Sequence, residues 1–201
     1  MRRVICTFPV MNTGDRKPVH VKNNQFTRYS TPYNIYLLAA IIEKAGYEID
    51  IRDWVSLNCD IERSAKELLE YDIVMFSCMS WSWPPVIWAI EYLRRFRSDQ
   101  VIIVGGMQAA LFGDQIVEEF PVDYAVYGEC ETTVVPLIEM IEKNGDPRRI
   151  PGLIYKDNGD IFKNDPARLL GCSEIADLPV PLYDRLPDDS CYNLSIESAR
   201  G

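Results

Sequence analysis

The chain has 201 residues, of which 47% are hydrophobic and 25% are charged, the composition of an ordinary soluble globular protein. Its formal net charge of −9 disfavours nucleic acid as a partner, because an acidic surface repels phosphate backbones. No apolar run reaches the roughly 18 residues of a membrane span, and Pro9 ends the first run too early for a signal peptide. We therefore expect a cytoplasmic protein with no membrane partner.

The predicted elements alternate between strand and helix along the chain. Short apolar runs bounded by turn residues predict strands at 3–8, 47–54, 72–78, 100–104 and 122–127. Amphipathic patterns and capping residues predict helices at 31–45, 60–71, 114–120 and 128–143, and a loop followed by a helix at 79–97, with Pro84-Pro85 at the helix start. This alternation predicts an α/β fold whose parallel sheet has helices on both faces. Five strands suit a doubly wound, flavodoxin-like sheet of order 2-1-3-4-5, with the most apolar runs, 72–78 and 100–104, in the centre.

The part of the chain after Gly145 has a different character. Asn158-Gly159 lies between two short apolar runs, which predicts a β-hairpin. Residues 165–190 are rich in Pro and Asp and are typical of an extended linker. We therefore divide the chain into a Rossmann-like α/β domain and a hairpin-and-linker part, 1–145 and 146–201.

The candidate binding site lies at the carboxyl ends of the predicted strands. Ligands of such sheets bind where the strand order reverses, which is between the first and third strands here. After the third strand, residues 77–83 supply hydroxyls together with Trp81 and Trp83, which either cover a flat ligand or cap the core. After the fourth strand, Gly105-Gly106 either lets a ligand approach the backbone or forms a tight turn.

The loop after the fifth strand adds backbone amides and acidic side chains. Tyr127-Gly128-Glu129 opens the predicted helix, so Glu129 and Glu131 either serve a ligand or only stabilise the helix dipole. The single histidine, His20, offers no Ser-His-Asp set, and neither a P-loop nor a G-x-G-x-x-G motif is present. The six cysteines show no C-x-x-C spacing, which argues against zinc and a disulfide framework. We predict no catalytic residue and no metal ligand in this chain.

Short motifs follow one another in a fixed order along nearly the whole chain. They are T-P-Y-N-I-Y-L-L-A-A at 31–40, A-G-Y-E-I-D-I-R-D at 45–53, D-I-V-M-F-S at 72–77, V-G-G-M-Q-A at 104–109, V-D-Y-A-V-Y-G-E-C-E-T-T at 122–133, I-P-G-L-I-Y-K-D-N-G at 150–159, L-P-V-P-L-Y-D-R-L at 178–186 and S-I-E-S-A-R-G at 195–201. Together they resemble the N-terminal cobalamin-binding domain of cobalamin-dependent radical S-adenosylmethionine enzymes. In that family the last motif is followed by the C-x-x-x-C-x-x-C loop that binds a 4Fe–4S cluster.

The resemblance implies which residues would contact cobalamin. Residues near the start of the first helix and in the preceding loop would face the corrin ring, namely Asn12, Thr13, Thr31, Tyr33 and Asn34. Residues after the third, fourth and fifth strands would contact the nucleotide tail, namely Ser77, Met79, Ser80, Trp81, Gly105, Gly106, Met107, Gln108, Tyr127, Gly128 and Glu129. Asp15 and His20 do not have the spacing of D-x-H-x-x-G, which leaves water, an open position or a loop side chain as the lower axial ligand.

The resemblance also implies a function for the parent protein. It predicts a methyltransferase in which cobalamin carries the methyl group, while the 4Fe–4S cluster and S-adenosylmethionine bind a C-terminal radical domain that would follow Gly201. This part alone would then be inactive. Two alternatives stay open: a cobalamin-free interaction or sensor domain of the same architecture, and a flavodoxin-type flavin or nucleotide domain. For the latter, residues 11–14 would form a phosphate loop poor in Ser and Thr.

Overall fold

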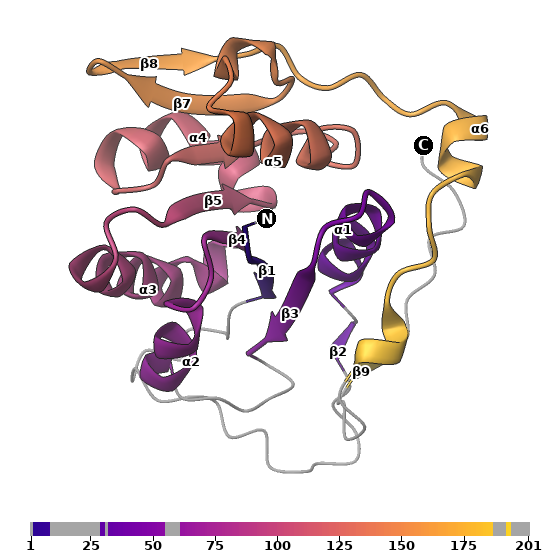
Figure 1. Cartoon of the computed structure of the whole chain (residues 1–201), viewed down its shortest axis with the longest axis horizontal. Coiled ribbons are helices and arrows are strands. Elements are labelled where there is room, and N and C mark those ends of the chain that lie inside the picture. Colours follow the sequence, from indigo (N-terminus) through magenta and orange to yellow (C-terminus); the bar gives the residue numbers. More distant parts are fainter. Residues whose placement is uncertain (1, 9–28, 31, 55–60, 187–191, 194–201) are drawn as a thin grey trace.

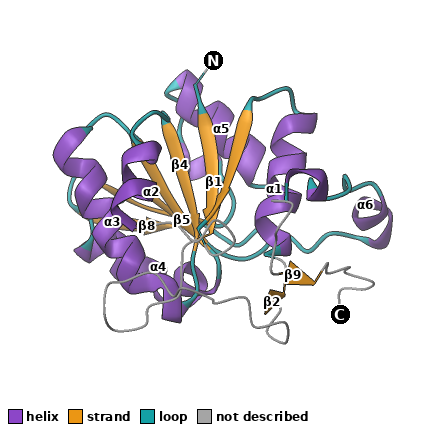
Figure 2. Cartoon of the chain, turned by 90° about the horizontal axis from the view of Figure 1, so that it is seen from below, coloured by secondary structure: helices purple, strands orange, loops and turns teal. Residues whose placement is uncertain are grey.

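A computed structural model describes residues 2–8, 29–30, 32–54, 61–186 and 192–193. The described chain forms a seven-stranded sheet with helices on both faces (Figures 1 and 2). In the order β3-β1-β4-β5-β6-β7-β8, its strands are Ile49–Asp53, Val4–Phe8, Ile73–Ser77, Val101–Gly105, Tyr124–Val126, Leu153–Asp157 and Asp160–Lys163. The α-helices α1 to α6 are Tyr33–Lys44, Ile61–Leu68, Trp83–Phe96, Met107–Glu119, Val134–Lys143 and Cys172–Ala176. The two short strands β2 and β9, Tyr29–Ser30 and Tyr192–Asn193, pair with each other separately.

The parallel part of the sheet has the predicted flavodoxin-like order. Strands β3, β1, β4, β5 and β6 pair in parallel in that sequence, which is 2-1-3-4-5 for the five predicted strands. The sheet nevertheless has seven strands instead of five. The predicted hairpin is present, with positive φ at Asn158 and Gly159, and its strand β7 pairs antiparallel with β6. The division at residue 145 stays a prediction.

The core consists of two apolar layers, one on each face of the sheet. Helices α2, α3 and α4 cover one face, where Phe76, Ile102 and Val104 are buried. Helices α1 and α5 cover the other face, where Cys6, Ile103 and other strand residues are buried. The central strands are therefore apolar on both sides, which explains their continuous apolar sequences.

Two predicted helix boundaries are wrong, and both errors involve glycine. Helix α4 begins at Met107 and not near residue 114, and it is kinked at Phe112. Gly113 lies inside this helix, where a Cβ would lie 2.5 Å from the Ile154 side chain, so the glycine permits close packing against β7. Helix α5 begins at Val134 and not at residues 128–129, because Gly128 has a φ of +79° and starts a turn instead.

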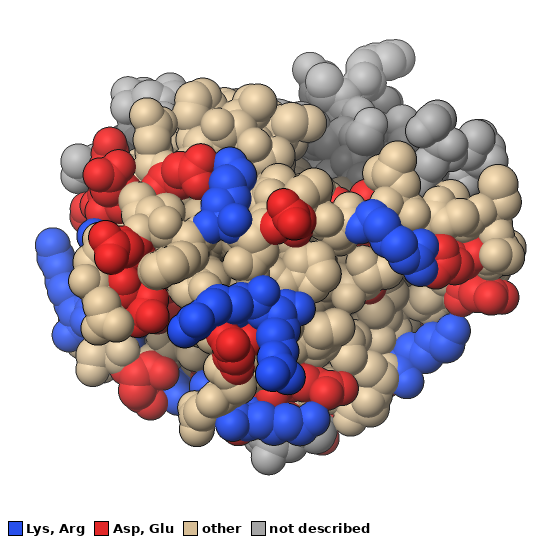
Figure 3. Space-filling model, turned by 90° about the horizontal axis from the view of Figure 1, so that it is seen from above, with Lys and Arg blue, Asp and Glu red and all other residues tan. Residues whose placement is uncertain are grey.

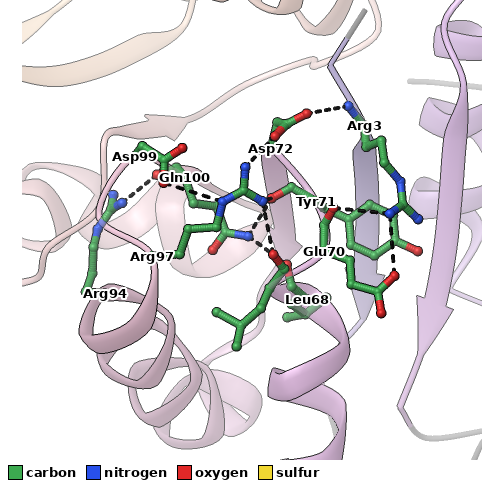
Figure 4. A network of polar contacts seen from close by, with 10 residues as sticks. Arg3, Leu68, Glu70, Tyr71, Asp72, Arg94, Arg97, Asp99 and Gln100 are labelled. Atoms are coloured by element: carbon green, nitrogen blue, oxygen red, sulfur yellow. Dashed lines mark hydrogen bonds and ion pairs between the residues drawn. The ribbon is translucent and has the colours of Figure 1, made fainter.

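The amino ends of the strands are held by a polar network on the edge opposite the candidate site (Figure 4). Arg97 at the end of α3 donates to the Tyr71 carbonyl at 2.6 Å and pairs with Asp72. The buried Gln100 side chain donates to the carbonyls of Leu68 and Tyr71 at 2.6 and 2.7 Å. These bonds satisfy carbonyls at the end of α2 and fix α2 and α3 relative to the sheet.

The connector after β8, residues 164–186, includes α6 and runs along the side of the molecule that carries α1 (Figure 1). As predicted, it is largely extended, and it contains only α6 and the 3₁₀ turn Tyr183–Arg185. The Leu182 amide donates to the Tyr36 carbonyl at 3.3 Å, and the Tyr183 ring packs against that of Tyr36. Arg185 donates to the Ile49 carbonyl at 3.0 Å on the edge strand β3. The connector is thus docked on the sheet domain.

One face of the molecule carries charged side chains of both signs. On the face shown in Figure 3, Asp and Glu side chains lie between Lys and Arg side chains. The exposed ion pairs of the described chain include Arg3 with Glu70 at 3.4 Å, although such pairs stabilise a fold only slightly. Within the described ranges, no helix is both long and apolar enough to cross a bilayer.

Candidate cofactor site

A cavity of about 760 Å³ opens at the carboxyl edge of the central strands, on the face that α1 and α5 cover. This is the position that the doubly wound order predicts for a ligand. Its volume is in the range of pockets that hold small molecules and cofactors. The cavity is therefore the candidate binding site of the chain.

The floor of the cavity consists of three strand residues, Cys6, Met75 and Ile103. They lie opposite one another on neighbouring strands, because Cys6 pairs with Met75 and Met75 pairs with Ile103 in the sheet register. The sulfur atoms of Cys6 and Met75 are 3.9 Å apart. Burial raises the pKa of the Cys6 thiol to about 12, so this thiol stays neutral at physiological pH. The floor is apolar and uncharged.

The walls come from the two helices on this face. Ile35 and Leu38 of α1 and Val134 and Leu137 of α5 line the cavity. In each helix the two residues are three positions apart, so they lie on the same side of the helix and face the sheet. The walls continue the apolar character of the floor toward the carboxyl edge.

Polar groups gather at the mouth of the cavity, where the strands end. The Asn34 side-chain amide donates to the Ser77 hydroxyl at 2.6 Å, which ties the first turn of α1 to the end of β4. On the other side of the mouth, the Leu170 amide of the connector donates to Glu129 at 3.0 Å. Glu131 also belongs to the lining of the cavity. A ligand would thus meet hydrogen-bonding groups at the entrance and apolar groups inside.

The turn after β5 requires a glycine at position 106. Gly106 has a φ of +81°, and a Cβ there would lie 2.6 Å from the Cys78 carbonyl oxygen. The Gln108 amide donates to that same oxygen at 3.0 Å, so the two loops after β4 and β5 are in backbone contact. The tight turn, one of the two alternatives for Gly105-Gly106, is therefore present. Gly106 also lines the cavity, so its backbone is accessible to a ligand as well.

The loop after β6 forms a turn and not the first turn of a helix. Thr133 is the N-cap of α5, so Glu129 and Glu131 precede the helix and do not stabilise its first turn. The half-buried Cys130 lies between them. Burial, with a further contribution from Glu131, raises the pKa of its thiol to about 12. This thiol is also neutral near pH 7.

Half of the predicted contact residues line the cavity: Tyr33, Asn34, Ser77, Gly105, Gly106, Met107, Gly128 and Glu129. Five others are described but lie outside its lining: Met79, Ser80, Trp81, Gln108 and Tyr127. Asn12, Thr13 and Thr31 lie outside the described residues, as do Asp15 and His20. The floor and wall residues were missed, although alternation along each predicted strand is a signal that could have found Cys6, Met75 and Ile103.

The residues outside the lining have other contacts. The Tyr127 hydroxyl donates to the Asn164 carbonyl at 2.5 Å, which ties β6 to the hairpin. Trp83 packs edge-on against Phe120, so it caps the core. Trp81 is instead exposed and contacts the Phe8 ring edge-on. The sequence left open whether the two indoles cover a ligand or cap the core. Of the two, Trp83 caps the core and Trp81 does not.

The described residues contain no cluster of three or more His, Cys, Asp or Glu side chains that could hold a metal ion. The cavity lining also includes no Lys or Arg among these residues. What the site offers is an apolar slot, a polar mouth and close access to the backbone at Gly106. These features suit binding and orientation of a bulky cofactor.

A doubly wound parallel sheet with an apolar cavity at its carboxyl edge defines a cofactor-binding domain of the flavodoxin-like type. The model of the B12 binding domain family matches residues 20–138, more than half of the chain. The chain belongs to the B12 binding domain family. The family match confirms the resemblance that the sequence motifs indicate.

Two curated proteins are similar in sequence to this chain. An uncharacterized methyltransferase of Pyrococcus horikoshii is 25% identical over 161 residues, which are 79% of this chain and 34% of that protein. The anaerobic magnesium-protoporphyrin IX monomethyl ester cyclase of Synechocystis is 29% identical over 80 residues, which are 39% of this chain and 16% of that protein. The chain thus spans about a third or less of the length of these relatives.

Solved structures of cobalamin-dependent radical enzymes share the fold. The radical S-adenosylmethionine methyltransferase TsrM of Kitasatospora setae, with cobalamin and a 4Fe–4S cluster bound, gives a TM-score of 0.65 at 21% identity, over 85% of this chain and 30% of that chain. The cobalamin-dependent S-adenosylmethionine radical enzyme OxsB, with aqua-cobalamin bound, gives a TM-score of 0.72 at 18% identity, over 92% of this chain and 24% of that chain. At such identities the likeness is one of fold.

Proposed function

We propose that this chain binds cobalamin, with the corrin ring at the carboxyl edge of the sheet and the nucleotide tail in the cavity. The observation that carries the proposal is the apolar cavity of about 760 Å³ at the strand ends of a chain from the B12 binding domain family. The tail of cobalamin ends in a flat, largely apolar benzimidazole ring. A slot with apolar walls and floor matches the chemistry of that ring.

The residues present fit such a tail in three respects. Gly106 has no side chain and belongs to the cavity lining, so a tail can approach its backbone closely. Asn34 and Ser77 place hydrogen-bonding groups at the mouth, where the ribose and the singly charged phosphodiester of a tail would lie. The neutral thiols of Cys6 and Cys130 add no charge to the slot. The chain would therefore bind and orient the cofactor and keep water away from its tail.

We further propose that the parent protein is a radical S-adenosylmethionine methyltransferase. When bound, cobalamin supplies a cobalt centre that can carry a methyl group. The 4Fe–4S cluster and S-adenosylmethionine would bind elsewhere in the parent protein, so this chain alone would not turn over a substrate. Support comes from the similar methyltransferase of Pyrococcus horikoshii and from the shared fold with TsrM.

A titration with hydroxocobalamin tests the binding proposal. We expect corrin absorbance to co-elute with the protein in gel filtration, and Leu38→Trp to weaken binding at least roughly tenfold by filling the slot. Leu111→Trp is the matched control, because Leu111 is an exposed leucine outside the cavity lining. Absence of corrin from the eluted wild-type protein, under both oxidising and reducing conditions, would contradict the proposal and favour a cobalamin-free domain.

A flavin or nucleotide domain is less compatible with this cavity. A terminal phosphate carries up to two negative charges and is normally held by cations or by several amides at a helix N-terminus. The described lining supplies Glu129 and Glu131 and no Lys or Arg, which would repel such a group. We therefore expect no flavin absorbance in the purified protein and no saturable binding of flavin mononucleotide.

A further inference from the structure

Polarity changes with depth in the cavity. The lining residues with strong hydrogen-bonding side chains lie near the mouth: Tyr33 and Asn34 in the first turn of α1, Ser77 at the end of β4, and Glu129 and Glu131 after β6. The floor residues are two positions deeper on the strands, since Met75 precedes Ser77 and Ile103 precedes Gly105 by two residues. Two residues of a strand span roughly 7 Å. A group that reaches the floor is therefore out of hydrogen-bonding reach of the mouth.

The groups that line the deep part are apolar or are weak hydrogen-bonding partners. Cys6 and Met75 contribute sulfur, and Ile103, Leu38 and Leu137 contribute hydrocarbon. A neutral thiol and a thioether are weak donors or acceptors, but both make favourable contacts with aromatic rings. The floor is thus suited to a flat ring that carries no strong donor or acceptor on its inner edge.

We infer that this cavity selects cobamides by their lower base and takes apolar bases of the benzimidazole and phenol classes in preference to purines. The inference rests on the proposed function. An adenine base would place its amino group and ring nitrogens against the sulfur and hydrocarbon floor, where they lose their hydrogen bonds to water without replacement. A phenol-type base has no ring nitrogen and loses nothing of that kind.

Absorbance titration of the wild-type chain with four corrinoids tests whether the lower base determines affinity. We expect cobalamin and p-cresolylcobamide to bind within about threefold of each other, and adeninylcobamide to bind at least roughly tenfold more weakly. Cobinamide, which lacks the nucleotide, should also bind more weakly than cobalamin. Equal affinity for adeninylcobamide would overturn the inference and leave the proposed function standing. Equal affinity for cobinamide would overturn both the inference and the placement of the tail in the cavity. Failure of all four to bind would overturn the proposed function itself.

Two variants locate the selectivity at the floor. Met75→Gln supplies an amide that can pair with a purine edge, so we expect it to reduce the preference for cobalamin over adeninylcobamide at least roughly threefold. Cys6→Ser adds a hydroxyl at the same level and should act in the same direction. Cys78→Ser is the matched control, because Cys78 is equally buried but packs on the opposite face of the sheet. An unchanged ratio in both folded floor variants, or an equal change in Cys78→Ser, would overturn the assignment.

Discussion

Asn34 and Ser77 are joined by a hydrogen bond of 2.6 Å across the mouth of the cavity. The bond connects the first turn of α1 with the last residue of β4, two elements that are 43 residues apart in the chain. It therefore fixes the width of the entrance by linking a helix on one face to the end of a central strand. Its loss should be measurable in stability even without a ligand.

Single replacement of either partner, Asn34→Ala or Ser77→Ala, should lower the free energy of unfolding by about 0.5–1.5 kcal/mol. Because both changes remove the same bond, the double variant should lose little more than the larger single loss. Urea denaturation of the four proteins measures this coupling. Ser80→Ala removes an exposed hydroxyl just beyond the same strand and serves as the control. Fully additive losses would show that the two side chains act independently.

Gly106→Ala should destabilise the protein by about 1–3 kcal/mol, because the substitution combines a strained backbone conformation with a steric clash. The clash is with the Cys78 carbonyl oxygen, which would lie 2.6 Å from the new Cβ atom. Gly105→Ala provides the matched control in the same turn, since its Cβ would lie 3.9 Å from the nearest atom, the Phe76 oxygen. Thermal or urea unfolding would compare the two. Equal losses would indicate that the turn adapts.

Alkaline pH should destabilise the fold through the buried thiols. The pKa of Cys6 is raised to about 12 in the folded state, against roughly 8.5 when unfolded. The folded state therefore keeps a proton that the unfolded state releases, and the free energy of unfolding falls as pH rises from about 8.5 toward 12. At pH 10 this amounts to at most about 2 kcal/mol for one thiol.

Urea denaturation at pH 7.5 and pH 10 tests the contribution of Cys6. The loss of stability between the two pH values should be smaller in Cys6→Ala than in the wild type. Cys172→Ala should keep the wild-type loss, because Cys172 is exposed on α6. If Cys6→Ala showed the full wild-type loss, its thiol would not be the group that resists ionisation.

Arg185 should protect the edge of the sheet. Its guanidinium donates to the Ile49 carbonyl at 3.0 Å and pairs with Glu43, so it covers part of the free side of β3. Arg185→Ala should cost about 1 kcal/mol and increase self-association, since an uncovered edge strand can pair with another chain. Urea denaturation and gel filtration at two protein concentrations measure both effects. Arg168→Ala, which removes a pair with Glu174 on the exposed α6, should change neither.

The order of the parallel strands could be predicted because it depends on local signals. Continuous apolar runs such as 73–76 require burial on both faces, and alternation with helices leaves few possible topologies. The start of α4 could not be predicted, because the role of Gly113 depends on Ile154, which lies 41 residues later. The pairing of β7 with β6 could not be predicted either, because an Asn-Gly signal predicts the hairpin turn but not the strand beside which the hairpin lies.

The mouth of the cavity was easier to predict than its interior. Ser77, Gly105 and Gly106 follow predicted strands directly, so the rule for doubly wound sheets places them at the site. Cys6, Met75 and Ile103 sit within strands and look like ordinary core residues. They become lining residues only because α1 and α5 leave space above them, which is a property of helix placement rather than of local sequence.

The antiparallel hairpin β7–β8 determines at which edge of the sheet the connector begins. Strand β7 starts beside Val126 at the carboxyl edge, and β8 brings the chain back to that edge, because Lys163 pairs with Ile154. Residues after β8 therefore leave the sheet next to the cavity, and within seven residues Leu170 reaches Glu129 at its mouth. The turn at Asn158-Gly159 thus reverses the chain and returns it to the carboxyl edge of the sheet, so that the connector contributes Leu170 to the mouth of the cavity.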